Sequence, residues 1–220
     1  MIRRRSPEDV PAPAQSVSQE WFTSLFADKA DPWDLATKWH DRRKFGVTVA
    51  SLPRQRYRSG FEPGCANGEL TRLLAPRCAA LLAVDFVESA VEAASEATRD
   101  LPHVRVQHAR LPEDLPAERF DLVVVSELLY YLSAADMAVL VDGLVDRLEP
   151  GGDLVAVHCR DDRRRVYDGA NVHAALRRPR TLEPLVHYED EAFVLDVSRR
   201  RSSVGPVRRW LGTRGGACSA

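Results

Sequence analysis

Short β-forming runs alternate with amphipathic segments of helical length through the middle of this 220-residue chain, and no other feature constrains the fold as much. The predicted elements are a strand at 58–63, a helix at 70–74, a strand at 80–84, a helix at 89–98, strands at 104–108 and 122–126, a helix at 134–148 and a strand at 153–158. Strands connected through helices form right-handed crossovers and a mostly parallel sheet. The pattern therefore predicts an α/β fold with a doubly wound, Rossmann-like sheet.

The N-terminal region predicts a cover for this sheet. Residues 1–16 lack apolar periodicity and are expected to form a disordered arm. Helices are expected at 19–26 and from Trp33 or Asp34 to Leu52, so that residues 17–53 form a helical lid.

The C-terminal region predicts an edge of the sheet. Two strands at 182–187 and 192–199 have no helix between them, which indicates an antiparallel hairpin. Residues 202–220 are rich in Gly, Arg and Ser and are expected to form a flexible tail. We therefore expect a single domain over residues 17–201.

The composition excludes several classes of protein. The 45% of apolar residues suffice for one core, and 31 basic against 32 acidic residues give a net charge of -1, without attraction to nucleic acid or an anionic membrane. No apolar run approaches the roughly 20 residues of a membrane span. We expect a cytoplasmic protein, a monomer or homodimer, without a metal. Cysteines without CxxC spacing favour reduced thiols: Cys65, Cys78, Cys159 and Cys218.

A glycine-containing loop follows the first predicted strand, at residues 61–68. Gly64 and Gly68 permit a tight turn and a close approach of the backbone to a ligand. The loop is not GxGxxG and lacks the Lys-Ser/Thr ending of a phosphate loop. These departures argue against a dinucleotide or a nucleoside triphosphate and favour a ligand with less phosphate.

An acidic residue follows about 20 residues after the loop, where Asp85 ends the second predicted strand. This spacing places a carboxylate within reach of ribose hydroxyls. Glu62 would attract the amino group or the sulfonium of S-adenosylmethionine, and Phe86 could stack on adenine. The alternative is that the loop holds ordinary turn glycines and that Asp85 caps a helix.

Taken together, these residues resemble the class I S-adenosylmethionine-dependent methyltransferases, with Glu62 to Gly68 as motif I. More narrowly, residues 31–200 are similar to the rhizobial NodS family, which N-methylates an amino sugar at the end of a chitin-like oligosaccharide. The stretches that carry the resemblance are Gly64 to Ala66, Leu74 to Cys78, Phe120 to Val124, Glu127 to Leu132, Pro150 to Gly152 and Arg160 to Asp161.

The resemblance implies a set of cofactor-binding residues. Arg43, on the predicted lid, could clamp the cofactor carboxylate with its planar guanidinium, or belong to a solvated basic helix face. Arg110 and Leu111 stand where an acidic residue often contacts adenine, which is a departure from the class. The complete expected set is Trp33, Arg43, Glu62, Gly64, Cys65, Ala66, Gly68, Asp85, Phe86, Arg110, Leu111, Ser126 and Glu127.

Candidates for catalysis and acceptor binding come from strand ends facing the cofactor. An amine must lose a proton before it attacks, and a hydroxyl needs a base during attack, which suits His or a carboxylate. The expected catalytic residues are His158, Tyr131 and Glu127, with Tyr131 and His158 as the preferred pair. Tyr130, Tyr131, His158 and His173 are expected to contact the acceptor. The alternative assigns the tyrosines and histidines to structural roles.

Three functions remain open from the sequence. The first is N-methylation of a small polar acceptor, an amino sugar or saccharide-containing metabolite. The second is O-methylation of a natural-product hydroxyl. The third is a non-catalytic nucleoside-binding or RNA-binding module, against which the intact Glu62 and Asp85 and the lack of a basic arm interleaved with aromatics argue.

Overall fold

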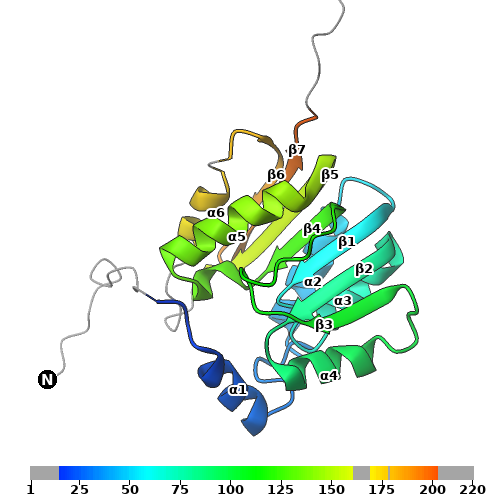
Figure 1. Ribbon diagram of the computed structural model, residues 1–220, viewed down its shortest axis with the longest axis vertical. Coiled ribbons are helices and arrows are strands. Elements are labelled where there is room, and N and C mark those ends of the chain that lie inside the picture. The colour runs from blue at the N-terminus through cyan, green and yellow to red at the C-terminus, as the bar shows by residue number, and fades with distance from the viewer. Residues whose placement is uncertain (1–14, 161–168, 178, 203–220) are drawn as a thin grey trace, which may run out of the picture.

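A seven-stranded sheet lies at the centre of the computed structural model, which describes residues 15–160, 169–177 and 179–202 (Figure 1). The strands are β1 (Tyr57–Pro63), β2 (Cys78–Asp85), β3 (Val104–His108), β4 (Phe120–Ser126), β5 (Leu148–Cys159), β6 (Leu182–Glu189) and β7 (Phe193–Arg200). The helices are α1 (Gln19–Asp28), α2 (Trp39–Ala50), α3 (Glu69–Leu74), α4 (Glu88–Ala97), α5 (Ala134–Arg147) and α6 (Gly169–Leu176), with 3-10 helices η2 (Ala75–Arg77) and η3 (Leu129–Tyr131).

The sheet order is β3-β2-β1-β4-β5-β7-β6. β7 runs antiparallel to both of its neighbours, whereas the other neighbouring strands are parallel. The predicted fold class is therefore confirmed, including the antiparallel hairpin of β6 and β7 at one edge.

Both faces of the sheet are covered, because the residues of the central strand β4 alternate between two cores. Val123 and Val125 pack in one cluster with residues of α5. Leu122 and Val124 belong to a second cluster with residues of α2 and α3. Figure 1 shows α5 across one face of the sheet and α2 and α3 behind the other. A strand buried on both faces has consecutive apolar residues, as from Leu122 to Val125, which explains why this run predicts a strand so clearly.

The second helix begins later than the sequence indicates. It was predicted to start at Trp33 or Asp34, whereas α2 starts at Trp39. The carboxylate of Asp31 accepts the backbone N–H of Leu35 at 2.9 Å, and Asp34 has a left-handed φ of 59°. A short acidic side chain that bonds nearby N–H groups competes with helix formation, so this segment forms turns instead.

The predicted turn at residues 150–152 lies inside β5 instead of before it. Phe120 pairs with Leu148, but Leu122 pairs with Asp153, so the register shifts and the extra residues of β5 bulge from the ladder. Gly151 has a φ of 79°, which suits glycine.

The N-terminal chain is tied to the domain from Ser16 onward. The hydroxyl of Ser16 donates to the carboxylate of Asp136 and accepts the N–H of Ser133 at 2.8 Å. The N–H of Val17 donates to the carbonyl of Tyr131 at 2.8 Å. These bonds place α1 beside η3. The predictions for residues 1–14 of the arm and 203–220 of the tail lie outside the described residues.

Within the described ranges, no helix is long and apolar enough to cross a membrane, and no group of His, Cys, Asp or Glu could hold a metal ion.

Gly68 is required for packing. It is the N-cap residue of α3, with a φ of 83°, and a Cβ built there would lie 3.0 Å from the backbone Cα of Ala94 in α4. We therefore expect Gly68→Ala to lower the free energy of unfolding by about 1–3 kcal/mol, because it adds backbone strain and a contact with backbone that cannot move freely.

Gly46 provides the matched control for a denaturation series. It lies in α2, and a Cβ there meets no atom within 4 Å. Gly46→Ala should stabilise the protein by about 0.5–1 kcal/mol, as Ala does in helix interiors. Equal effects of the two substitutions would contradict the assigned role of Gly68.

Candidate functional site

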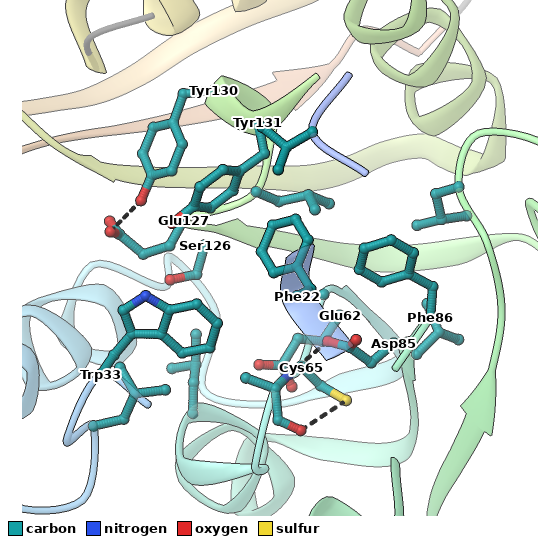
Figure 2. Close-up of a pocket in the computed structure, with 18 of the residues that line it drawn as sticks. Phe22, Trp33, Glu62, Cys65, Asp85, Phe86, Ser126, Glu127, Tyr130 and Tyr131 are labelled. Carbon is teal, nitrogen blue, oxygen red and sulfur yellow. Dashed lines mark hydrogen bonds between the residues drawn. The ribbon is translucent and has the colours of Figure 1, made fainter. Parts of the chain in front are cut away.

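A cavity of about 580 Å³ lies at the carboxyl ends of β1, β2 and β4. The strand order reverses between β1 and β4, and open parallel sheets bind ligands at such a point. Figure 2 shows acidic side chains on the sheet side of this cavity and aromatic side chains closing it. The volume falls in the range typical of small-molecule sites.

The backbone after β1 turns sharply around the end of β2. Gly64 has a φ of 75° and Ala66 a φ of 48°. The N–H groups of Gly64 and Cys65 donate to the carbonyl of Val84 at 2.8 and 3.0 Å. The carboxylate of Asp85 accepts the N–H of Ala66 at 3.0 Å. A carboxylate has about four acceptor sites, so Asp85 is held at the cavity and retains capacity for a ligand hydroxyl.

Glu62 is a buried carboxyl with unused hydrogen-bonding capacity. Burial, together with the neighbouring Asp85, raises the pKa of Glu62 to about 8. Among the residues that the structure describes, Oε2 of Glu62 and Oγ of Ser126 are buried without a hydrogen-bond partner, and both residues line the cavity. S-adenosylmethionine carries an ammonium group and ribose hydroxyls, so these residues and Asp85 fit the cofactor that the resemblance implies.

An aromatic cluster closes the other side of the cavity. Phe22 of α1 packs against Tyr131, Phe86 and Trp33, with ring centroids 4.9, 5.2 and 6.4 Å away. Figure 2 shows these rings around the cavity. The sequence predicted the helical cover but did not single out Phe22, because helical spacing of aromatics is equally typical of an ordinary core.

Glu127 lies at the end of the cavity away from Asp85 and is held from several sides. Its Oε1 accepts the N–H of Cys159 at 2.8 Å and lies 3.3 Å from Nζ of Lys44. Its Oε2 accepts the hydroxyl of Tyr130 (Figure 2). Glu127 also has a φ of 56°, which is unfavourable for a residue with a side chain and is typical of functional sites.

Lys44 is a site residue that the sequence interpretation missed. It is 1% exposed, and its ammonium donates to the carboxylate of Asp41 at 2.8 Å. Burial opposes its charge, but Glu127 and Asp41 raise its pKa above the ordinary value. The sequence interpretation considered Arg43 in this segment, with a solvated basic helix face as the alternative, and gave Lys44 no role of its own. The helical spacing of Asp41, Lys44, Phe45 and Thr48, which are all buried, was the signal that could have revealed it.

Most of the expected residues do line this cavity. They are Trp33, Glu62, Gly64, Cys65, Ala66, Asp85, Phe86, Arg110, Leu111, Ser126, Glu127, Tyr130 and Tyr131. His40, Asp41, Lys44 and Cys159 line it as well and were not expected.

Arg43 and Gly68 do not line the cavity. Arg43 donates to the carboxylate of Asp190 and lies at the same distance, 2.6 Å, from the hydroxyl of Tyr188. Its guanidinium is thus held at the β6–β7 hairpin and not at the cavity, contrary to the expectation that Arg43 clamps the cofactor carboxylate. Gly68 faces Ala94 of α4, so its role is packing.

His158 and His173 also lie outside the cavity lining. Both are fully buried, and their rings contact each other with Nδ1 of His158 3.2 Å from Nε2 of His173. His173 lies on α6. Neither ring therefore lines the cavity, contrary to the expectation that His158 acts as a base and that both histidines contact the acceptor.

Comparisons with known proteins agree first on the class of fold, that of the Rossmann-like methyltransferases. A protein from Pseudomonas syringae, whose crystal structure is named as a candidate methyltransferase, is 45% identical, with a TM-score of 0.67 over 74% of this chain and 100% of that chain. The N-methyltransferase NodS from Bradyrhizobium japonicum WM9, in complex with S-adenosyl-L-homocysteine, is 30% identical with a TM-score of 0.74, over 82% of this chain and 97% of that one.

The chain belongs to the nodulation protein S (NodS) family, whose sequence model matches residues 22–177. Nodulation protein S from Rhizobium tropici is 34% identical over 133 residues, which is 60% of this chain. That match spans 56% of the length of the Rhizobium protein. The resemblance stated from the sequence is thus confirmed at the level of the family.

The raised pKa of Glu62 gives a test of the site that needs no substrate. A carboxyl whose pKa is raised to about 8 on folding stabilises the protein in acid, and this stabilisation is lost as the pH rises from the ordinary value of 4.5 through about 8. Glu62→Gln removes that loss. At pH 8 its melting temperature should exceed that of the wild type by about 2–4 °C for each 1 kcal/mol gained, and the difference should shrink toward pH 5. A melting temperature below that of the wild type at pH 8 would contradict the assignment.

Proposed function

We propose that this protein is an S-adenosylmethionine-dependent N-methyltransferase acting on an amine of a small polar acceptor, an amino sugar or saccharide-containing metabolite. The observation that carries the proposal is that one cavity joins the acidic cradle of Glu62 and Asp85 to the constrained carboxylate of Glu127. Membership of the NodS family and the N-methyltransferase named among its structures support the reaction type.

The cradle would hold the cofactor through four kinds of contact. Asp85 would accept the ribose hydroxyls, and Glu62, ionised by a nearby cation, would pair with the ammonium group. Phe86, which lines the cavity next to Asp85, would lie against adenine. Trp33 and the α1 aromatics would exclude water from the sulfonium.

When bound, the cofactor would supply an electrophilic methyl group. The lone pair of the acceptor would attack this methyl carbon in line while the thioether sulfur leaves with the electrons of the C–S bond, so the protein contributes mainly by positioning. Glu127 would accept an N–H of the acceptor amine and aim its lone pair at the methyl group. The same carboxylate would then balance the positive charge that the amine gains on methylation. Tyr130 and Lys44 fix the two oxygens of Glu127 in place.

Cofactor binding is tested by calorimetric titration of the protein with S-adenosylhomocysteine. We expect micromolar affinity for the wild type. Asp85→Ala should weaken it by about a hundredfold, because hydrogen bonds donated to a charged acceptor contribute ~1.5–3 kcal/mol each. Asp100→Ala, which removes an exposed carboxylate paired with Arg72, should leave the affinity unchanged. Absence of binding by well-folded wild type would favour the non-catalytic module.

The acceptor is tested by assaying methyl transfer to glucosamine oligosaccharides and locating the new methyl group by NMR. Transfer to nitrogen is expected, and a methylated hydroxyl would instead establish the O-methyltransferase alternative. Glu127→Gln should lower kcat by about 10²-fold, as loss of an electrostatic contact to the reacting group does, without abolishing S-adenosylhomocysteine binding. Glu118→Gln, the same change in an exposed ion pair with Arg105, serves as the control.

A further inference from the structure

A chain of buried polar groups runs from β7 to the wall of the cavity. Oδ2 of Asp196 lies 2.8 Å from Nδ1 of His173. Nε2 of His173 lies 3.2 Å from Nδ1 of His158. Nε2 of His158 accepts the backbone N–H of Leu129 at 3.3 Å. The two imidazoles are fully buried and come from different elements, His158 from β5 and His173 from α6.

The contacts determine where the imidazole protons lie. His158 accepts a backbone N–H at Nε2, so its own proton is on Nδ1 and donates to His173. His173 then accepts at Nε2 and donates from Nδ1 to Asp196. Every link points in one direction, and both rings are neutral with Nδ1 protonated. An additional proton on either ring would break one of the links.

Asp196 anchors the chain with a permanent negative charge. Burial opposes ionisation, but hydrogen bonds from His173 and His187 lower the pKa of Asp196 to about 2, and the charge of Arg177 contributes. Nδ1 of His187 is 2.6 Å from Oδ1 of Asp196, and Arg177 is 3.2 Å from Oδ2. The carboxylate therefore stays ionised throughout the neutral range and fixes the proton on His173.

The opposite end of the chain meets the acceptor side of the cavity. The N–H of Leu129 belongs to the first residue of η3, whose next residue is Tyr130. The ring of Tyr130 packs edge-on against the ring of His158, with centroids 5.1 Å apart and an interplanar angle of 76°. The hydroxyl of Tyr130 in turn donates to Glu127. One hydrogen-bonded and packed series thus links Asp196 to Glu127.

We propose that His158, His173 and Asp196 are positioning residues for methyl transfer, which act by holding η3 so that Tyr130 orients Glu127 toward the acceptor. This inference rests on the proposed function for its effect on catalysis. The hydrogen-bonded arrangement itself does not rest on the proposed function, since its tautomers and contacts involve no substrate. The ion pair of the buried Asp153 with the partly exposed Arg199 offers a comparison, because it also lies between β5 and β7 but does not line the cavity.

The arrangement is tested on the wild-type protein by ¹⁵N NMR of its histidine side chains, assigned with His158→Gln and His173→Phe. Both His158 and His173 are expected to carry their proton on Nδ1, since Nε2 of each ring accepts a hydrogen bond. The usual Nε2-protonated form at either ring would overturn the inference. This measurement needs no substrate, so it separates failure of the chain from failure of the proposed methyltransferase.

The effect on catalysis is tested with Asp196→Asn and Asp153→Asn, which each remove one buried carboxylate charge. Asp196→Asn should lower kcat by about tenfold while the Kd for S-adenosylhomocysteine and the KM for the acceptor change by less than about threefold. Asp153→Asn should lower only the melting temperature. Equal kcat for the two variants would overturn the positioning role.

Two substitutions of His158 test whether its hydrogen bond to Leu129 is what maintains activity. In His158→Gln the side-chain oxygen can still accept the N–H of Leu129, whereas in His158→Leu it cannot. The Gln variant should retain several-fold more kcat than the Leu variant. Equal activities would contradict a role that acts through this hydrogen bond.

Discussion

The two ion pairs of the buried Lys44, one with Glu127 and one with Asp41, are the interactions on which the rest of the site depends. An ammonium group that is 1% exposed is tolerated only when its charge is balanced, and removal of one partner typically costs ~3–5 kcal/mol. The ion pair between Lys44 and Glu127 joins α2 to the end of β4, so it fixes the helical cover over the strand ends. It also places the carboxylate of Glu127 against the N–H of Cys159 at the end of β5. The unfavourable φ of Glu127 is thus imposed by contacts on several sides.

Glu62 and Glu127 both line the cavity, but they differ in where their hydrogen-bonding partners come from. Glu127 receives its partners from the protein, from Lys44, Cys159 and Tyr130. Glu62 has an oxygen without a partner among the described residues, and its pKa is raised to about 8. A ligand cation would lower that pKa and recover the free energy lost on burial. Burial of Glu62 therefore lowers the stability of the free protein, and binding of a ligand cation beside it would restore that stability. Such a trade of stability for function is common at functional sites.

The sequence predicted the elements whose signal is local. The β-forming runs on either side of the loop, Asp85 at a strand end and the hairpin without an intervening helix were all correct because periodicity and chain order determine them. Phe22 and Lys44 were missed because their roles depend on contacts with distant segments. Arg43 was misassigned for the same reason, since Tyr188 and Asp190 lie far along the chain.

The error at His158 has a more specific cause. Parallel strands bring their carboxyl ends to one edge, so reasoning from strand ends identifies the strand that reaches the cavity. It does not identify which of two consecutive residues faces it, because side chains alternate. Ala156 lies in the cluster that contains α5 residues, whereas Val155 and Val157 lie in the cluster on the α2 side. His158 is two residues after Ala156, on the same side of the strand, and contacts His173 and Tyr130. Cys159 is two residues after Val157, on the opposite side, and contacts His40 and Lys44 at the cavity. A histidine at a strand end can therefore influence a site that it does not line, here by holding Leu129 and Tyr130 in place.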